Sequence, residues 1–141
     1  MNAIEVNAIE VAQNNFNSWN RHDVDAVVAT YAEGATYSHP RAGENLTGEA
    51  IRKFLKAVWV AYPDASVEII STGDTGGGLV ATQWVMHATN TGPLPDGTQA
   101  TGRTVALHGA SFAQFEGDKI RSERVYFDMH NLFEQLGLKA K

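Results

Sequence analysis

Hydrophobic residues in the first half of the chain recur every three or four positions, a spacing that places them on one side of a helix. Such stripes run over residues 9–19, 23–34 and 48–62. The second stripe begins at an aspartate suited to cap a helix and closes at a glycine. A short extended segment, 35–39, and a polar loop, 41–47, separate the second stripe from the third. The pattern therefore predicts three helices in this half.

Beyond Pro63 the pattern changes to an alternation of polar and apolar residues, which is typical of strands with one buried face. Turn residues divide this region into four strands, which we place at residues 66–72, 79–90, 104–115 and 120–128. The segment 91–103 is rich in Gly and Pro, and loops of this kind often cover the mouth of a pocket. Leu132, Phe133 and Leu136 then recur at helical spacing, so a short helix should follow the last strand.

Helices that precede an antiparallel meander make an α+β fold, and 141 residues suit one domain, 1–141. The net charge is −5 and the 11 Lys and Arg are scattered, which argues against a nucleic-acid partner. No apolar run approaches the roughly 20 residues that span a bilayer, so we expect no membrane partner. The N-terminus shows no basic, apolar leader and the chain has no cysteine, so we expect a cytoplasmic protein without disulfides.

The most informative stretch is the junction between the last strand and the last helix. Within 120–128, alternate residues point to opposite faces, so Asp128 shares a face with Ser122, Arg124 and Tyr126, and Glu123 shares the other with Val125 and Phe127. Asp128 has two interpretations. It is a helix N-cap that accepts backbone N–H groups, or it is a partly desolvated carboxylate with a raised pKa that transfers protons near neutral pH.

The order of the predicted elements resembles the nuclear-transport-factor-2-like superfamily, and within it the SnoaL-like polyketide cyclases. The segments that carry this resemblance are 25–35, 46–54, 62–64, 102–103, 115–120, 126–128 and 135–137. The resemblance implies a cone-shaped α+β barrel, with three helices packed in a curved mixed or antiparallel sheet and a short C-terminal helix. It also implies a homodimer that pairs through the sheet.

The resemblance further implies an intramolecular aldol ring closure or an isomerisation of a hydrophobic, polyketide-like carbonyl compound, without metal or cofactor. The general acid/base of the family corresponds to Asp128, seven residues before Gln135, and a histidine on the preceding strand corresponds to His108. If Phe115 faces Ile120, then His108 points away from the pocket, whereas a one-residue bulge would turn it inward.

The remaining candidates would bind the substrate. The oxyanion donor would be His108 or Tyr126, and Arg124 would be either a substrate contact or a solvated cross-strand ion pair. Apolar and aromatic side chains that would hold a flat ring system, or simply fill the core, are Phe16, Trp19, Tyr37, Trp59, Trp84 and Met86.

Two features depart from the family pattern and leave alternatives open. Asn90 stands where many relatives have a pocket-rim histidine, and Tyr126 stands where they often have tryptophan. A non-catalytic protein that binds a small hydrophobic ligand, or an interaction module that docks through its sheet, has the same sequence pattern. An epoxide-hydrolase-like enzyme would need a second buried aspartate, and Asp64, Asp74, Asp96 and Asp118 all fall in predicted turns.

Overall fold

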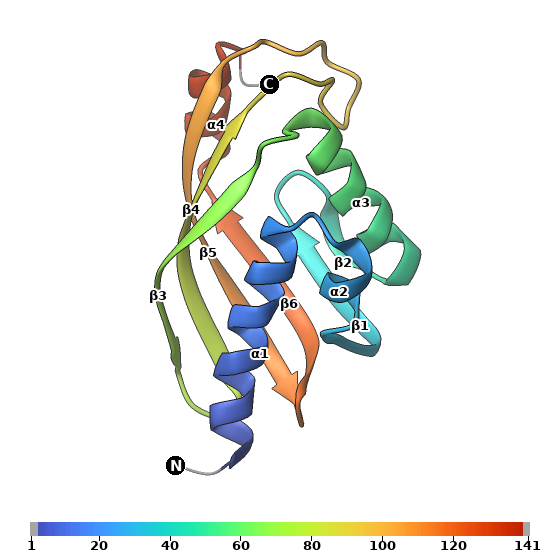
Figure 1. Cartoon of the computed structure of the whole chain (residues 1–141), viewed down its shortest axis with the longest axis vertical. Helices are drawn as coiled ribbons and strands as arrows, with labels where there is room; N and C mark the ends of the chain where they lie inside the picture. The colour runs from blue at the N-terminus through green and yellow to red at the C-terminus, as the bar shows by residue number, and fades with distance from the viewer. Residues whose placement is uncertain (1–2, 140–141) are drawn as a thin grey trace.

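A long, curved sheet wraps around one side of the helices in the computed structural model, which describes residues 3–139 (Figure 1). The helices are α1 (Ala3–Asn20), α2 (Val24–Val28), α3 (Gly48–Ala61) and α4 (Met129–Leu136). The strands are β1 (Tyr31–His39), β2 (Gly43–Leu46), β3 (Ser66–Asp74), β4 (Leu79–Thr89), β5 (Thr104–Glu116) and β6 (Lys119–Phe127). The predicted order of three helices, a meander and a short helix is confirmed.

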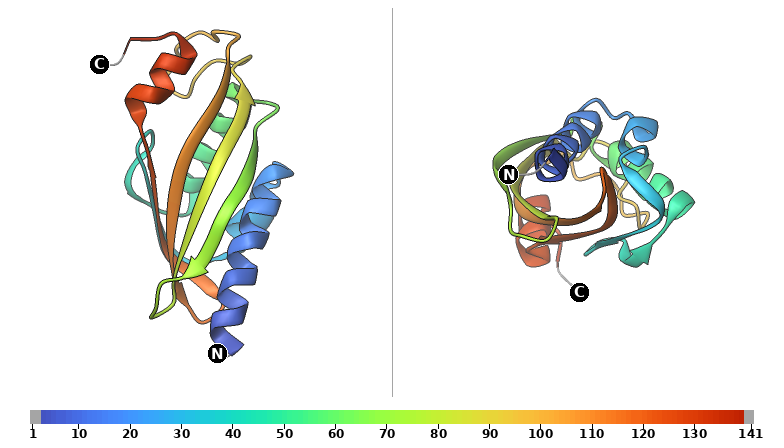
Figure 2. Two further views of the ribbon diagram at one scale, coloured as in Figure 1. Left: turned by 90° about the vertical axis from the view of Figure 1, so that its left-hand side faces the viewer. Right: turned by 90° about the horizontal axis from the view of Figure 1, so that it is seen from below.

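The six strands lie in the order β2-β1-β6-β5-β4-β3. β1 runs parallel to β6, while every other neighbouring pair is antiparallel, so the sheet is mixed. Seen from below, the sheet curls around α1, and its edge strands β2 and β3 do not meet (Figure 2). The predicted α+β cone with a curved mixed sheet is confirmed. The sheet does not close into a complete barrel.

The second helix is shorter than predicted, because the chain leaves it at Val28 and enters β1 at Tyr31. The two β-branched residues Val28 and Thr30 disfavour helix continuation. The backbone N–H of Ile120 donates to the carbonyl of Thr30 (2.9 Å) and so draws this segment into the sheet. The predicted helix over 29–34 is therefore wrong, and Tyr31 becomes a strand residue. The predicted loop 41–47 likewise contains the short strand β2.

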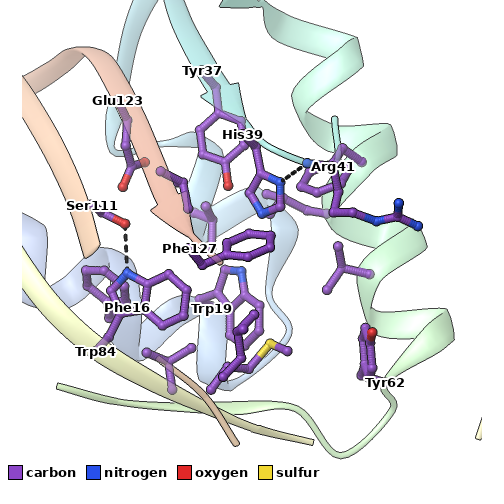
Figure 3. A pocket seen from close by; sticks show the side chains of 18 of the residues that line it. Phe16, Trp19, Tyr37, His39, Arg41, Tyr62, Trp84, Ser111, Glu123 and Phe127 are labelled. Carbon is purple, nitrogen blue, oxygen red and sulfur yellow. Dashed lines mark hydrogen bonds between the residues drawn. The ribbon is translucent and has the colours of Figure 1, made fainter. Parts of the chain in front are cut away.

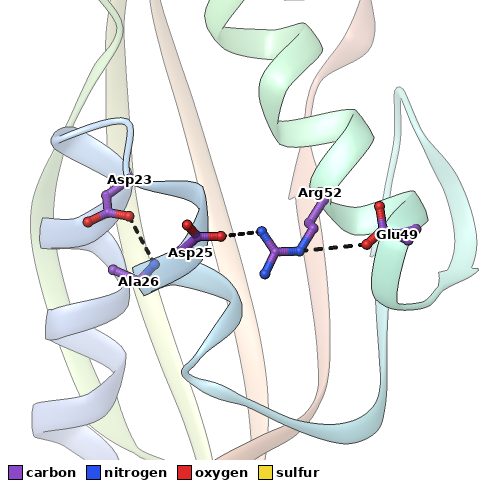
Figure 4. Close-up of polar contacts among 5 residues, drawn as sticks. All are labelled: Asp23, Asp25, Ala26, Glu49 and Arg52. Atoms are coloured by element: carbon purple, nitrogen blue, oxygen red, sulfur yellow. Dashed lines mark hydrogen bonds and ion pairs between the residues drawn. The ribbon is translucent and has the colours of Figure 1, made fainter.

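Polar contacts hold α2 against α3 (Figure 4). Asp23 caps α2 by accepting a hydrogen bond from the backbone N–H of Ala26 (3.1 Å). The guanidinium of Arg52 on α3 pairs with Asp25 on α2, and its Nε lies 3.9 Å from Glu49 one turn earlier. The Arg52–Asp25 pair links α3 to α2, and such exposed pairs contribute only modestly to stability.

A one-residue bulge interrupts the hairpin formed by β5 and β6. Phe115 pairs with Ile120, but the next pair is Gln114 with Ser122, which leaves Arg121 as the extra residue. Because side chains alternate along a strand, the bulge changes which set points inward. Glu123, with Val125 and Phe127 beyond it, therefore faces the helices, and the alternate residues of β6 face outward.

A buried asparagine anchors loop 90–103. Asn90 is fully buried, and its Nδ2 donates to the carbonyls of Ala61 (3.1 Å) and Gly92 (2.9 Å). Its Oδ1 accepts from the backbone N–H (2.8 Å) and the hydroxyl (3.1 Å) of Thr101. The residue expected at a pocket rim is thus a structural clamp between α3 and both ends of the loop. Within residues 3–139, no helix combines the length and apolarity needed to cross a bilayer.

Candidate functional site

A cavity lies between the concave face of the sheet and the helices α1 and α3 (Figure 3). The centre of a water molecule can reach about 100 Å³ of it, several times the roughly 10–15 Å³ that one water needs. Most of its lining is apolar or aromatic, contributed by Phe16, Trp19, Val27, Phe54, Leu55, Val58, Val67, Trp84, Met86, Leu94, Pro95, Leu107, Val125, Phe127 and Leu132. The polar lining residues are few, so each of them decides what the cavity can do.

Glu123 is the one carboxylate in the described lining of this cavity. It is 7% exposed and accepts a short hydrogen bond from the hydroxyl of Tyr31 through Oε1. No described residue donates to its second oxygen, and the carboxyl points into the cavity in Figure 3. Burial raises the pKa of Glu123 to about 7, against the smaller opposing effect of the Tyr31 hydrogen bond. Near neutral pH this group can both give and take a proton.

Two residues of β1 add polar atoms to the same cavity. Tyr37 is buried, and burial first and the charge of Glu123 second raise its pKa well above the usual range. It therefore stays a neutral O–H donor. His39, two residues further along the strand, lines the cavity with its ring against Phe54 (centroids 4.6 Å apart) and Phe127 (5.2 Å). Both side chains lie on the face that contacts the helices.

Trp84 and Gly109 form a flat part of the wall. The indole Nε1 of Trp84 donates to the hydroxyl of Ser111 (2.9 Å), so this hydroxyl is already engaged. A Cβ at position 109 would overlap the Trp84 ring, so only glycine lets the indole pack directly on β5. The ring thus presents an apolar face to any ligand in the cavity.

Arg41 lies at the opposite end of the cavity from Glu123 (Figure 3). Its Nη2 is 3.4 Å from Asp96 Oδ2 on loop 90–103, and its guanidinium carbon lies 5.1 Å from the centroid of the Phe133 ring. This end of the cavity therefore carries an Arg41–Asp96 ion pair under the loop. Among residues 3–139, no three His, Asp or Glu side chains are grouped to hold a metal ion.

The structure brings five of the predicted substrate-binding residues into the cavity lining, and whether they bind a substrate stays a prediction. They are Phe16, Trp19, Tyr37, Trp84 and Met86. Trp59 is a correction, because it lies behind the lining. Its ring stacks on His22 (4.9 Å between centroids, 9° between planes) and meets Trp19 edge-on (5.7 Å).

The placement of Asp128, His108, Tyr126 and Arg124 in an internal pocket is wrong. All four are exposed on the outer side of the sheet or at its end. Asp128 caps α4 by accepting from the backbone N–H of Asn131 (3.1 Å), which is the N-cap interpretation. Arg124 forms an exposed ion pair with Glu44 (2.8 Å), which is the solvated alternative. The bulge at Arg121 explains the error, since it turns the opposite face of β6 inward.

The bulge itself was one of the two registers that the sequence allowed, but its consequence differs from the expectation. Continuing the register places His108 opposite Asp128, and both line a shallow depression on the outer face together with Tyr126. Glu123, Tyr31 and His39 were missed. The sequence held a signal for two of them: Glu123 shares a face with the apolar pair Val125 and Phe127, and His39 shares one with Tyr37.

Comparison with known proteins gives the family. The model of the SnoaL-like domain matches residues 12–123, which is most of the chain. The chain belongs to the SnoaL-like family. The matched region ends at Glu123 and contains Tyr31, Tyr37 and His39, so it includes the polar residues that face the cavity.

Several solved structures share the fold. A candidate polyketide cyclase from Xanthomonas campestris pv. campestris superposes with a TM-score of 0.83 at 23% identity, covering 95% of this chain and 99% of that one. A candidate SnoaL-like polyketide cyclase from Jannaschia sp. CCS1 gives 0.87 at 15% identity, with 99% and 98% coverage. TerC, co-crystallised with polyporic acid, gives 0.77 at 15% identity, with 93% and 98% coverage. No curated protein matches the sequence at a significant level.

Proposed function

We propose that this protein is a cofactor-independent acid/base catalyst that acts on a hydrophobic carbonyl compound, as a polyketide cyclase or isomerase, with Glu123 as the base. The observation that carries the proposal is a buried carboxyl group that points into an apolar cavity and has one partner, Tyr31. Burial destabilises the charged carboxylate and raises the pKa of Glu123 to about 7, so the neutral and the charged form are both populated near pH 7. Family membership and the polyporic acid bound to TerC support a flat, oxygenated, ring-containing substrate.

The chemistry balances without any further reagent. The Glu123 carboxylate removes a proton from a carbon next to a carbonyl group, and the electron pair of that C–H bond passes to the carbonyl oxygen as an enolate. In a ring closure the enolate carbon then attacks a second carbonyl carbon of the same molecule. A C–C bond forms, and the alkoxide recovers the proton from the Glu123 carboxylic acid. The apolar lining excludes water while the enolate exists.

The test is exchange of carbon-bound protons in a simple probe, 2-tetralone, a flat bicyclic ketone with acidic protons beside its carbonyl. Wild-type protein in D₂O should accelerate their replacement by deuterium, followed by proton NMR. Glu123→Gln should lower the protein-catalysed rate at least about 100-fold, because it removes the general base. The wild-type rate should also rise with pH and be half-maximal near pH 7, where Glu123 ionises.

The matched control for Glu123→Gln is Asp128→Asn, which changes the other carboxylate and retains a side chain suited to an N-cap. We expect Asp128→Asn to exchange 2-tetralone protons at close to the wild-type rate. If Asp128→Asn loses the activity and Glu123→Gln keeps it, the proposal for Glu123 is overturned. If neither wild type nor Asp128→Asn exceeds Glu123→Gln, the acid/base function itself is overturned.

The second candidate is a non-catalytic protein that binds a hydrophobic ligand, and the largely apolar lining is the observation that favours it. Binding of 2-tetralone without proton exchange would support this candidate. The epoxide-hydrolase alternative requires an Asp-Arg-Asp arrangement, and the described lining of the cavity contains Arg41 but no aspartate.

We also propose that two copies pair through the outer face of the sheet, where Phe112 and Tyr126 are exposed and their rings meet edge-on (5.8 Å between centroids). Light scattering should give the mass of a dimer. Replacing Phe112 by Asp should give a monomer with an unchanged circular dichroism spectrum, because the charge would be buried at the contact. A monomeric mass for the wild type at high concentration would contradict the proposal.

A further inference from the structure

The imidazole of His39 is held in one tautomer by the backbone. The N–H of Arg41 donates to Nδ1 of His39 (3.0 Å), so that nitrogen must keep its lone pair. In a neutral ring the proton then resides on the other nitrogen, Nε2. The donor is a backbone amide in the turn that follows β1, so it does not titrate and does not depend on the rotamer of the Arg41 side chain. The turn sequence itself therefore sets which ring nitrogen carries the proton.

The ring also stays neutral. Burial, and after it the positive charge of Arg41, lowers the pKa of His39 to about 3. The titratable and charged groups around the ring are Arg41 and Tyr37. The positive charge of Arg41 disfavours protonation of His39, and the neutral Tyr37 does not favour it. Phe54 and Phe127 pack against the ring and add no charge. His39 is thus a fixed neutral donor rather than a base or a proton carrier.

The donor itself is open toward the cavity. Nδ1 accepts from the backbone N–H of Arg41, and no hydrogen bond from Nε2 is found among the described residues. Figure 3 shows the free edge of the ring turned toward the interior of the cavity, between Phe127 and the side that carries Arg41. His39 is only partly buried and Nε2 is not among the buried atoms without a partner, so a ligand oxygen in the cavity can reach this donor and take the place of water.

We propose that the Nε2–H of His39 is the hydrogen-bond donor that holds the carbonyl oxygen of the substrate and stabilises it as the enolate forms. The inference rests on the proposed acid/base function, because an enolate oxygen arises only when Glu123 removes a proton. It assigns the substrate class more narrowly: a flat compound whose reacting carbonyl oxygen reaches His39 while the carbon beside it faces Glu123.

The neighbouring residues suit this role. The hydroxyl of Tyr37 projects from the same strand into the same cavity and is a neutral O–H donor for a second oxygen. The guanidinium of Arg41, which pairs with Asp96, also lines this side of the cavity. A neutral imidazole is a far weaker acid than an imidazolium ion, so it donates a hydrogen bond to an enolate oxygen without transferring its proton. The arrangement therefore favours substrates with two oxygens on one edge of a ring system.

The first test observes His39 directly in the unmodified protein. In wild type with ¹⁵N-labelled histidine, long-range proton–nitrogen correlation should show a protonated Nε2 and an unprotonated Nδ1 for His39 throughout pH 5–8. Addition of 2-naphthol, whose hydroxyl oxygen stands for an enol oxygen on a flat ring, should shift the Nε2–H signal. A protonated Nδ1, or an Nε2–H signal that does not move at saturating 2-naphthol, would overturn the proposal.

The second test separates hydrogen bonding from packing. His39→Gln keeps an N–H donor at nearly the reach of Nε2, whereas His39→Leu keeps the bulk and loses the donor. Calorimetry should show 2-naphthol binding about tenfold weaker for His39→Leu but within about threefold of wild type for His39→Gln. Equal losses in both variants, or no loss in either, would contradict a donor role. His130→Gln, at an exposed position of α4, is the matched control.

Failure of this inference can be distinguished from failure of the proposed function by Glu123→Gln. That variant lacks the base but retains His39, so it should lose exchange of 2-tetralone and keep the 2-naphthol shift of Nε2–H. If exchange depends on Glu123 but the His39 signal never responds, the acid/base function stands and the donor assignment falls. If the His39 signal responds and exchange is absent, the donor site exists in a binding protein.

Discussion

The buried carboxyl of Glu123 makes the stability of the protein depend on pH in a predictable way. The perturbation is Glu123→Gln, which keeps the size of the side chain and an oxygen that can accept from Tyr31. It removes only the ability to ionise. The difference in unfolding free energy between wild type and variant therefore isolates this group, because every other titration occurs in both proteins.

The sign follows from the two pKa values. In the unfolded chain the pKa of Glu123 should be near its ordinary value of 4.5, and in the fold it is about 7. Below pH 4.5 both states are protonated and the stability is fully present. Between pH 4.5 and 7 the unfolded state releases a proton that the native state retains, so wild type loses stability as pH rises. At about 1.4 kcal/mol for each unit of pKa difference, the full loss is about 3 kcal/mol.

The assay is urea unfolding of both proteins at half-unit steps from pH 4 to 8.5, with near-ultraviolet circular dichroism to confirm equal native packing. Glu123→Gln should gain about 3 kcal/mol relative to wild type between pH 4.5 and 7 and then remain level. A difference that is flat with pH would refute the reasoning, since it would mean that Glu123 has the same pKa in both states. A gain for wild type at high pH would refute it as well.

Three other substitutions test separate parts of the structure. Tyr31→Phe removes the hydrogen bond that opposes the burial effect, so the pKa of Glu123 should rise above about 7 in a carbon NMR titration, and a fall would contradict this. Asn90→Ala leaves the buried partners of its amide unsatisfied and should lower the unfolding free energy by about 2–4 kcal/mol in urea, whereas a loss below about 1 kcal/mol would argue against the clamp. Gly109→Ala pushes a methyl group into the Trp84 ring and should cost about 1–3 kcal/mol with a changed tryptophan fluorescence, and an unchanged spectrum would refute the contact.

The spacing of apolar residues predicted most elements correctly, because it reports which side of a helix or strand is buried. It could not locate the end of α2. The apolar stripe that begins at Val24 continues to Tyr31 at helical spacing. In the structure, however, Tyr31 is a strand residue, because it pairs with Ile120 of β6. Such pairing joins segments distant in sequence, and local periodicity contains no information about it.

The acidic residue predicted to face the pocket lies on the face of β6 opposite the cavity. Alternation along β6 divides its residues into two sets correctly, yet each set contains an acidic residue and an aromatic one, so alternation alone does not show which set is buried. The bulge at Arg121 decides this, and a bulge depends on the partner strand. A desolvated carboxylate does lie on β6, but it is Glu123 in the middle of the strand, whereas Asp128 at its end caps α4.

The parallel pairing of β1 with β6 has a consequence for how the protein is made. Tyr31 and Glu123, which form a hydrogen bond, are 92 positions apart in sequence. Tyr37 pairs with Glu123 in the register of β1 and β6. Contacts of such long range form slowly, because a large loop must close before they contribute any stability. While the chain is being synthesised, the N-terminal helices and β1 must wait for β6 to emerge from the ribosome. The cavity, which needs residues of both β1 and β6 in its wall, therefore forms only after β6 has been synthesised.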